Sequence, residues 1–312
     1  MNLEPSENTS IYGFKYFFNE IIELYNNRKM PNKILLSGKK GSGKSTFAYH
    51  LVNFFLSKDE ELKYDLIENK INSENKSFKL LQNNSHPNFY LIDLLAEKKN
   101  IDVAQIRGMI SYTNKSTFNN QDRFIMIDNV EYLNKNSINA LLKIIEEPNE
   151  NIYFILIANS EKNILPTLKS RCIKFKIHFS FDETVNICNQ TLNQNILNEL
   201  NHDFINYYCT PGEIIKLVQF AEEKQINLKD HDVSSIISLI IENTYYKKNI
   251  FIKNLLINFI ELFLLKSYIT SNNKNFILNF YQNFIKKINN TEKFNLDEES
   301  LFLEFKMKLV NE

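Results

Sequence analysis

Short apolar runs alternate with amphipathic stretches along the first half of the chain. Runs of about four to eight apolar residues indicate strands, whereas apolar residues that recur at about every third or fourth position indicate helices. The middle runs are almost continuously apolar, as is typical of parallel strands whose two faces are both covered by helices. The predicted strands are residues 34–37, 89–92, 124–127, 153–157 and 172–175. The alternation predicts a three-layer α/β domain with a mainly parallel sheet.

Helix signals lie between these runs. Asp102 stands before an amphipathic stretch and Gln105 follows it, in the pattern of a capping box. Apolar residues at helical spacing continue over 138–145, and Pro148 is expected to end that helix because proline has no backbone N–H. Residues 58–85 are polar and charged, and we interpret them as a surface insertion.

After about residue 180 the short apolar runs give way to helical spacing. The stretch 255–264 is apolar on more than one side, which is typical of helices that are buried or that meet a partner. The predicted helices cover 187–200, 213–224 and most of 233–308, with turns at 271–274 and 289–293. The second half of the chain is therefore expected to be all-helical.

The composition is that of a folded protein without a bulk charge. Of the 312 residues, 43% are hydrophobic, and 37 basic residues balance 37 acidic ones. A mainly disordered chain and a polycationic nucleic-acid binder are therefore both excluded. Residues 1–10 are polar, and the longest apolar runs are far shorter than a membrane span. We expect a cytoplasmic protein with no membrane partner.

The three cysteines are Cys172, Cys188 and Cys209. They lie far apart and form no CxxC pair, so that their spacing indicates neither a zinc site nor a disulfide framework. Buried thiols in a reducing compartment are the expected state. No zinc is expected as a cofactor.

A glycine-rich motif follows the first apolar run. The sequence Gly-Lys-Lys-Gly-Ser-Gly-Lys-Ser at 38–45 matches the phosphate-loop pattern between a predicted strand and a predicted helix. Its glycines allow positive φ angles and a close approach of backbone N–H groups to phosphates. Lys44 is expected to reach the β- and γ-phosphates, and the Ser45 hydroxyl to bind Mg²⁺. The predicted nucleotide-binding residues are Gly38, Lys39, Lys40, Gly41, Ser42, Gly43, Lys44, Ser45 and Thr46. A chance glycine turn is the alternative.

The predicted strand at 124–127 ends in Asp128, at the edge of the sheet where ligands of open α/β folds bind. Asp128 is predicted to hold Mg²⁺ together with Ser45, and a helix cap or a turn is the alternative role. Hydrolytic proteins of this class usually place Glu at the next position, where this chain has Asn129. An amide cannot accept the proton of an attacking water. The sequence therefore supports nucleotide binding more firmly than hydrolysis.

Together with the phosphate loop, three further motifs resemble one family. They are Ile-Asp-Asn-Val-Glu-Tyr-Leu-Asn at 127–134, Asn-Ala-Leu-Leu-Lys-Ile-Ile-Glu-Glu-Pro at 139–148 and Ser-Arg-Cys at 170–172. This set looks like the bacterial clamp-loader AAA+ subunits of DNA polymerase III. The resemblance is strong over about residues 10–220 and only architectural beyond.

The resemblance implies an architecture, a cofactor and partners. It implies an AAA+ phosphate-loop core with a parallel sheet at 1–180, a small helical lid at 181–226 and an all-α collar domain at 227–312. The collar would join a circular hetero-pentamer with gamma/tau and delta subunits. The complex would contact the sliding clamp and primer-template DNA, and the implied cofactor is ATP or ADP with Mg²⁺.

Within this family the chain is similar to the delta-prime subunit. The motor subunit, gamma/tau, usually carries Leu-Arg-Asp at the start of the lid helix, and that Arg senses nucleotide. This chain has Thr-Pro-Gly-Glu at 210–213 and no arginine after Arg171. Ser-His-Pro-Asn at 85–88 looks like the delta-prime segment before the second strand. The zinc-binding cysteines of gamma and of many delta-prime subunits are absent from 58–85.

The resemblance also implies roles for single residues. Arg171 is expected to point out of its own subunit toward the γ-phosphate of ATP bound next door. Its planar guanidinium can bind phosphate oxygens bidentately and never loses its charge. Asn159 ends the fourth predicted strand, where the family has its sensor 1 residue, and is expected to contact the γ-phosphate. A surface ion pair for Arg171 and a plain turn for Asn159 are the alternatives.

Four functional hypotheses stay open at this point. The first is a delta-prime-like stator that binds nucleotide weakly or structurally and supplies Arg171 to a motor neighbour during clamp loading. The second is an active gamma-type motor or a related DNA-remodelling ATPase, in which Glu131 would be the general base. The third, a small-molecule kinase, would need several arginines around the transferred phosphoryl group, and this chain has a single arginine after residue 123. The fourth is a scaffold that has lost nucleotide affinity.

Overall fold

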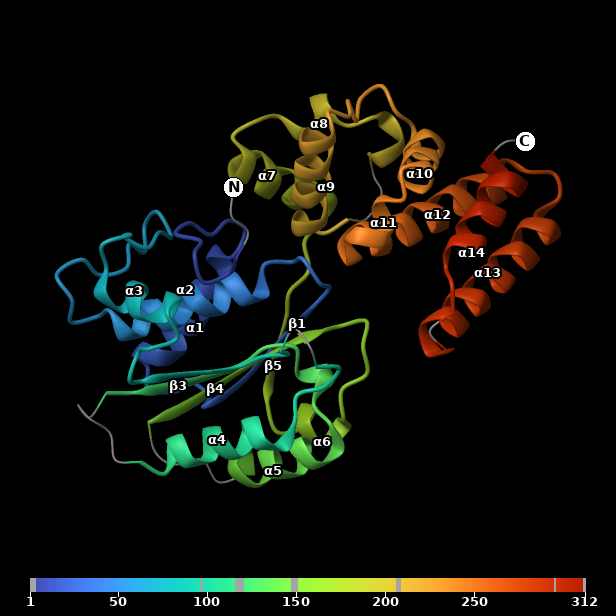
Figure 1. The fold of residues 1–312 in the computed structure, drawn as a ribbon. Helices are drawn as coiled ribbons and strands as arrows, with labels where there is room; N and C mark the ends of the chain where they lie inside the picture. Colours follow the sequence, from blue (N-terminus) through green and yellow to red (C-terminus); the bar gives the residue numbers. More distant parts are fainter. Residues whose placement is uncertain are drawn as a thin grey trace. The chain divides into compact units, whose positions relative to one another are not determined.

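The computed structural model describes residues 4–95, 98–115, 121–146, 151–205, 209–294 and 296–310. The chain divides into two compact units, which Figure 1 draws in sequence colours. The first unit comprises residues 1–192 together with 210–212, and the second comprises 193–209 and 213–312. Each unit buries its own set of apolar side chains.

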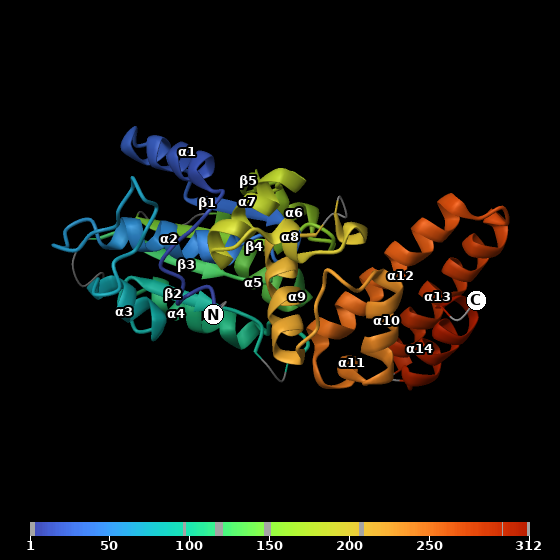
Figure 2. The same cartoon turned by 90° about the horizontal axis from the view of Figure 1, so that it is seen from above.

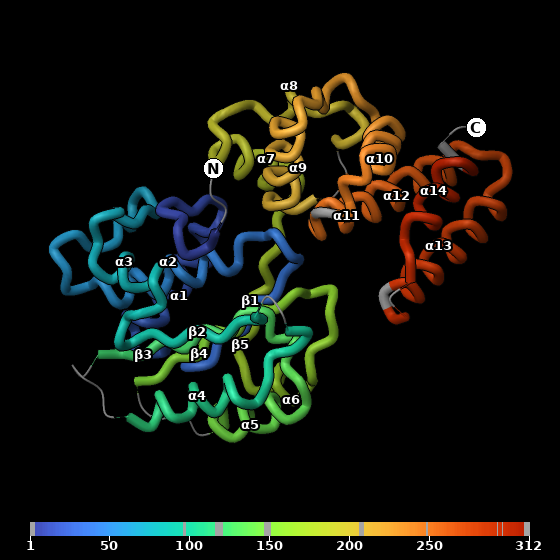
Figure 3. Tube along the Cα trace, in the orientation of Figure 1, coloured from blue at the N-terminus to red at the C-terminus, as the bar shows by residue number. Residues whose placement is uncertain are grey.

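In the described part of the first unit, five strands form one parallel sheet in the order β2-β3-β4-β1-β5. The strands are β1 (Lys33–Gly38), β2 (Phe89–Ile92), β3 (Arg123–Ile127), β4 (Ile152–Asn159) and β5 (Ile173–Lys176). Their traces run side by side in Figure 3. β1 lies between β4 and β5, and its last residue, Gly38, pairs with Asn159. All the strands predicted from the apolar runs are confirmed.

Helices cover both faces of this sheet (Figure 1). One face carries α1 (Lys15–Asn26), α2 (Lys44–Leu56) and α3 (Lys76–Gln82), and the other carries α4 (Val103–Thr113), α5 (Lys135–Glu146) and α6 (Pro166–Lys169). Successive strand residues point to opposite faces. Leu36 of β1 therefore packs in the cluster of Phe47 from α2, whereas Leu35 packs in the cluster of Leu141 from α5. The predicted three-layer core is confirmed.

Helix starts and ends follow local signals. Asp102 caps α4 by accepting hydrogen bonds from the N–H groups of Ala104 and Gln105, each at 3.1 Å. Its own N–H donates to Oε1 of Gln105 at 3.2 Å, which completes the predicted capping box. Such a cap satisfies N–H groups that the start of a helix leaves unpaired. Pro148, which is predicted to end α5, lies outside the described residues.

The predicted insertion is a folded part of the first unit, and buried polar side chains hold it against α2. Asn75 caps α3 by accepting from the N–H of Phe78 at 2.7 Å, and its Oδ1 also accepts from Nδ2 of Asn53 at 3.0 Å. His50 of α2 shares a hydrogen bond of 2.9 Å with the hydroxyl of Tyr64. Because these groups are taken from water, each needs its partner, and the network fixes the fold of the insertion.

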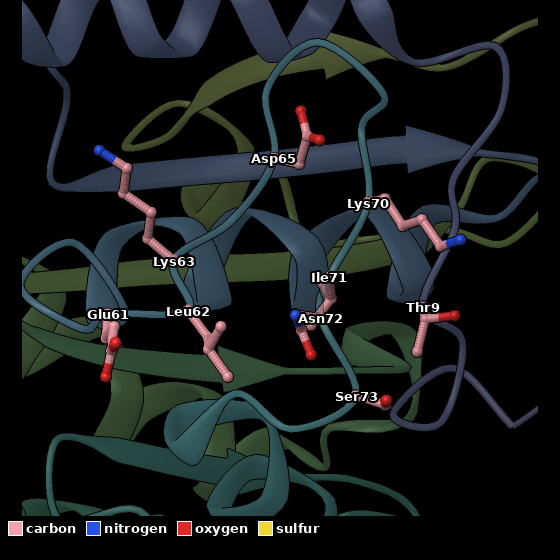
Figure 4. Close-up of a pocket in the computed structure, with 9 residues that line it drawn as sticks. All are labelled: Thr9, Glu61, Leu62, Lys63, Asp65, Lys70, Ile71, Asn72 and Ser73. Atoms are coloured by element: carbon pink, nitrogen blue, oxygen red, sulfur yellow. The ribbon is translucent and has the colours of Figure 1, made fainter.

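A cavity of about 630 Å³ lies at the same insertion (Figure 4). Its charged lining consists of Lys63 and Lys70 together with Glu61 and Asp65. In Figure 4 the ammonium groups of the two lysines point in opposite directions. Since the charges of one sign do not converge on one point, the lining does not have the form of an anion site.

Among the described residues of the second unit, all regular structure is helical. Its elements are α8 (Ile196–Glu199), η2 (His202–Phe204), α9 (Pro211–Lys224, whose first turn begins in the first unit), α10 (Val233–Glu242), α11 (Tyr245–Lys248), α12 (Ile250–Thr270), α13 (Lys274–Phe294), α14 (Glu299–Phe305) and η3 (Lys306–Val310). The helices α12, α13 and α14 lie side by side in Figure 2, and the ring of Phe305 meets those of Phe263, Phe280 and Phe284. The all-helical second half is confirmed. No helix in the described ranges is long and apolar enough to cross a bilayer.

Two local predictions are wrong. The predicted turn at 289–293 lies inside α13, because Ile288 and Thr291 are buried there and tertiary packing overrides the weak helix propensity of the neighbouring asparagines. The predicted helix 187–200 is interrupted. Its first part is the end of α7 (Phe181–Leu192), after which Asn193 takes a left-handed φ of 54° that ends the helix.

Candidate nucleotide-binding site

The candidate site lies at the carboxyl edge of the sheet, where β1 leads into the predicted phosphate loop. β1 ends at Gly38, and α2 begins at Lys44. Gly41 and Gly43 have φ angles of 82° and 77°, which residues with a Cβ rarely adopt. A Cβ at Gly38 would come within 2.3 Å of a backbone oxygen. The shape of the loop therefore requires the glycines of the motif.

Side chains of the loop fold back onto its backbone. Nζ of Lys44 donates to the carbonyl of Lys39 at 2.6 Å and to Oγ of Ser42 at 3.3 Å. The Ser42 hydroxyl donates to the same carbonyl at 2.9 Å. The ammonium group is thereby held at the start of α2, where the first-turn N–H groups have no partner inside the helix. A positive charge beside such donors is suited to a phosphate.

Asp128 and Ser45 meet at the site. Oγ of Ser45 donates to Oδ2 of Asp128 at 2.5 Å, and the N–H of Asn129 donates to Oδ1 at 2.7 Å. The structure thus brings together the residues predicted to hold Mg²⁺, one from α2 and one from the end of β3. A hydroxyl and a carboxylate are oxygen ligands of the kind that Mg²⁺ prefers beside phosphate oxygens, so that these residues fit the ion.

Burial shifts the pKa of both charged groups at this site. It lowers the pKa of Lys44 to about 8, against the opposing effects of Asp128 and Glu131. Burial also raises the pKa of Asp128 to about 6; the Ser45 hydrogen bond lowers it and Asp93 raises it further. Both shifts disfavour the charged form, and a phosphate beside Lys44 or a cation beside Asp128 would oppose them.

Asp93 belongs to the site although the sequence analysis does not single it out. It follows β2 directly and accepts a hydrogen bond from Nδ2 of Asn129 at 2.7 Å. Asn129 has a left-handed φ of 57°, a conformation that asparagine tolerates better than most residues. The signal was present in the sequence, because Asp93, like Asp128, ends an apolar run at the carboxyl edge of the sheet. The amide at 129 therefore holds a second carboxylate.

Glu131 also reaches the site, from the 3₁₀ turn η1 (Val130–Tyr132) that follows β3. Its Oε2 accepts a hydrogen bond from the N–H of Asn159 at 3.2 Å, and its charge raises the pKa of Lys44. Asn159 ends β4 as predicted, and its Oδ1 accepts from the N–H of Glu161 at 3.1 Å, which forms a local turn. Asn159 thus forms the plain turn that the sequence analysis gave as the alternative to a sensor role. It does so at the position where the sensor residue is expected.

A comparison with protein families identifies the group to which the site belongs. A family model described as "DNA polymerase III, delta subunit" matches residues 15–180, which is more than half of the chain. The chain belongs to this family. The resemblance of its motifs to the clamp-loader subunits of the delta-prime and gamma group is thereby confirmed.

Curated members of the delta-prime and gamma group match over part of their length. DNA polymerase III subunit delta' of Pseudomonas aeruginosa is 31% identical over 101 residues, covering 32% of this chain and 31% of the relative. DNA polymerase III subunit gamma of Buchnera aphidicola subsp. Schizaphis graminum is 30% identical over 182 residues, covering 58% and 47%. Subunit delta' of the same organism is 29% identical over 161 residues, covering 51% and 47%. The chain thus spans less than half the length of these relatives.

Solved structures resemble the chain at low identity. A gamma subunit-related protein of Thermotoga maritima has a TM-score of 0.46 and 14% identity, covering 91% of this chain and 96% of that one. The RuvB Holliday junction branch migration motor of the same organism has a TM-score of 0.43 and 15% identity, covering 78% and 81%. The family match and the parallel sheet together confirm the predicted AAA+ core, and an all-helical region follows it.

In this member of the delta subunit family, Arg171 lies at the surface. Its Nη2 donates to Oε1 of Glu146 at 2.6 Å and its Nη1 to the carbonyl of Thr167 at 2.9 Å, and the side chain is 35% exposed. Glu146 belongs to the motif at 139–148, so that the ion pair joins two of the family motifs. An ion pair this open to solvent contributes about 0–1 kcal/mol.

The cysteines and the other possible metal ligands of the described residues are not gathered into a cluster. Within the described ranges, no group of three or more His, Cys, Asp or Glu side chains is arranged to hold a metal ion. Of the cysteines, Cys188 is buried, Cys172 and Cys209 are half-buried, and they form no disulfide. Burial raises the pKa of the Cys172 thiol to about 11 and that of Cys188 to about 12. These two side chains are therefore neutral thiols at ordinary pH.

Proposed function

We propose that this chain is a delta-prime-like subunit of the DNA polymerase III clamp loader. In this proposal it is a stator that binds ATP or ADP with Mg²⁺ weakly or structurally and supplies Arg171 to the nucleotide site of a motor neighbour. The observation that carries the proposal is the surface position of the Arg171 guanidinium in a chain of this family. Its acceptors are a solvent-exposed carboxylate and a backbone carbonyl, and phosphate oxygens of a neighbour can take their place.

The chain's own site supports binding more than turnover. Lys44 and the N–H groups of the loop at 38–46 would bind the phosphates, and Ser45 and Asp128 would hold Mg²⁺, which neutralises phosphate charge when bound. Asn129 stands where a general base is usual, and its Nδ2 group already donates a hydrogen bond to the carboxylate of Asp93. Because an amide cannot accept the proton of water, the chain alone is expected to hydrolyse ATP slowly or not at all.

The proposed partners are the gamma/tau and delta subunits of a hetero-pentamer in the cytoplasm, with the sliding clamp and primer-template DNA contacted through the complex. The proposed domains are the core at 1–180, the lid at 181–226 and the collar at 227–312. Exposed apolar side chains on α12 and α13, such as Ile269 and Phe276, support a role of the collar in subunit association.

Co-purification tests the proposal directly. The chain is co-expressed with the gamma and delta subunits of its own organism, and ATP hydrolysis is measured with and without primed DNA. We expect a stable complex, DNA-stimulated hydrolysis by the complex, and little hydrolysis by the single chain. Robust hydrolysis by the single chain, or no complex with either subunit, would contradict the stator. A complex that forms while the chain binds no nucleotide would favour the pure scaffold.

A second candidate is an active motor in which Glu131 is the general base, because the hydrogen bond to Asn159 brings this carboxylate to the site. In that case Glu131→Gln would lower single-chain hydrolysis by about 10²-fold or more, as is usual when a general base is lost. We expect no change, since the stator hydrolyses little to begin with. The hydrolysis rates of the wild type and of Glu131→Gln are compared at saturating ATP. Lys44→Ala gives the background rate, and the comparison decides between the candidates.

A further inference from the structure

The chain returns to the phosphate loop far along its length, at residues 210–212. Oγ1 of Thr210 donates to the carbonyl of Lys40 at 2.9 Å, across 170 positions of sequence. The N–H of Gly212 donates to the carbonyl of Gly41, also at 2.9 Å. Contacts assign 210–212 to the first unit, whereas the chain on either side belongs to the second. The fit between this segment and the loop is therefore a property of the first unit.

The segment fits the loop closely. Thr210 is buried, with 1% of its surface exposed. A Cβ on Gly212 would lie 2.8 Å from the carbonyl oxygen of Gly41 and 3.0 Å from its Cα. Both are backbone atoms, so that a larger residue at 212 would force the loop or the segment to move. Sγ of Cys188 approaches the carbonyl of Pro211 at 3.7 Å, which supports the segment from α7.

These contacts fix the peptide groups on both sides of Gly41. In a trans peptide the C=O and N–H groups point in opposite directions. With the Lys40 carbonyl turned toward Thr210, the N–H of Gly41 faces away from the segment. With the Gly41 carbonyl turned toward Gly212, the N–H of Ser42 turns back over the loop and donates to the carbonyl of Lys39 at 3.4 Å. Successive N–H groups inside such a loop are the donors that bind phosphate.

We propose that Thr210 and Gly212 are positioning residues for nucleotide binding, which hold two carbonyls of the phosphate loop so that its N–H groups face the phosphates. The inference rests on the proposed binding of ATP or ADP at this loop. The donors are then oriented before the ligand arrives, and the loop does not lose conformational freedom on binding. Position 212 requires glycine because a side chain there would meet the backbone of Gly41, and position 210 requires the hydroxyl that donates to Lys40.

The test measures nucleotide affinity by titration of a fluorescent ADP analogue with Mg²⁺. Gly212→Ala is expected to weaken binding by about 10-fold or more, because the loop must shift, and Thr210→Val by about 3- to 10-fold, the value of one hydrogen bond. Thr210→Ser keeps the hydroxyl and is expected to restore affinity. Gly108→Ala is the matched control: a Cβ there would meet the flexible end of Tyr90 at 2.8 Å, and affinity should stay unchanged.

Melting temperature and hydrogen exchange of the amides at 40–43, both without nucleotide, separate positioning from a general loss of stability. Faster exchange in Gly212→Ala with an unchanged exchange pattern in Gly108→Ala supports the inference. Wild-type affinity in Gly212→Ala and Thr210→Val would overturn it while leaving the proposed function intact. Losses that follow the melting temperature in every variant, Thr210→Ser included, would also overturn it. A wild-type chain that binds no nucleotide would overturn both.

Discussion

Lys44 and Asp128 are held in positions where burial opposes their charge. The pKa of Lys44 is lowered to about 8 and that of Asp128 is raised to about 6, although the two groups attract each other. A site that keeps two charges at such a cost in folding free energy is suited to a ligand that carries charges of its own, here a phosphate beside the ammonium and a cation beside the carboxylate. The electrostatics of single residues therefore support Mg²⁺–nucleotide binding.

The pH dependence of binding follows from these pKa values. Mg²⁺-dependent affinity for ADP is expected to fall below about pH 6, where Asp128 becomes protonated, and to fall again above about pH 8, where Lys44 loses its proton. Titrations with and without Mg²⁺ from about pH 5 to about pH 9 check this expectation. The acid limb should be absent in the Mg²⁺-free series, and a flat profile in both series would contradict the assignment of Asp128.

Asp128→Asn is expected to stabilise the fold. Because the folded pKa of about 6 lies above the ordinary value of 3.8, the ionised carboxylate costs folding free energy at high pH, and the cost is lost as the pH falls through this range. The gain at about pH 7.5 should be at most about 3 kcal/mol, and much smaller at about pH 4. Urea unfolding of both proteins at the two pH values measures it, and a gain that does not depend on pH would argue against the buried charge as its cause.

The elements around the sheet are joined to it by distinct kinds of contact. Apolar clusters hold α2 and α5 to opposite faces, whereas the insertion is fastened to α2 by hydrogen bonds between buried polar side chains. The hydrogen-bonded network around Asn75 thus fixes the fold of the insertion against α2.

Asn75→Ala is expected to lower the free energy of unfolding by about 2–4 kcal/mol, since it removes the cap of α3 and leaves the buried amide of Asn53 without an acceptor. Asn72→Ala is the control in the same segment: Asn72 accepts from the N–H of Glu74 at the surface, and the loss should stay within about 0.5 kcal/mol. Urea unfolding compares the variants. Equal losses, or a stability that falls on addition of a zinc chelator, would contradict the hydrogen-bonded insertion.

The chain combines an α/β core with a region that is helical throughout its described residues. The family match covers the core, and the helical region presents exposed apolar residues on α12 and α13. The guanidinium of Arg171 lies at the surface of the core and is paired with an exposed carboxylate. In the proposed function, ATP hydrolysis is therefore an activity of the complex, and a change in this chain is measured as a change in hydrolysis by the neighbouring subunit.

Arg171→Ala is expected to leave the fold and assembly of the complex intact but to lower its DNA-stimulated ATP hydrolysis by up to about 10³-fold. This is the lower end of the effect that arginine fingers have on kcat. Arg107→Ala is the control, because Arg107 is exposed on α4 and has no role in the proposal. Gel filtration verifies assembly, and steady-state hydrolysis with primed DNA gives the effect. Equal rates for the wild type and Arg171→Ala would remove the role in trans.

Local sequence determined the elements of this protein and part of its site. The apolar runs predicted every strand of the described sheet, the pair Asp102 and Gln105 predicted a helix start, and the glycines at 41 and 43 predicted the loop. These features depend on neighbouring residues alone: on alternation of side chains, on the missing Cβ and on unpaired N–H groups at a helix end. The turn predicted at 289–293 is wrong because it was judged from neighbouring residues alone. The asparagines there are helical, since buried side chains beside them hold that part of α13 in place.

Tertiary structure alone decided which distant residues meet. Asp93 and Glu131 join the site because β2, β3 and β4 are adjacent in the sheet, and no local pattern encodes that order. The pairing of Arg171 with Glu146, and the contact of Thr210 and Gly212 with the phosphate loop, likewise arise from segments far apart in the chain. The pKa values of Lys44 and Asp128 follow from burial, which the fold sets, because only packing determines how much water reaches a charged group.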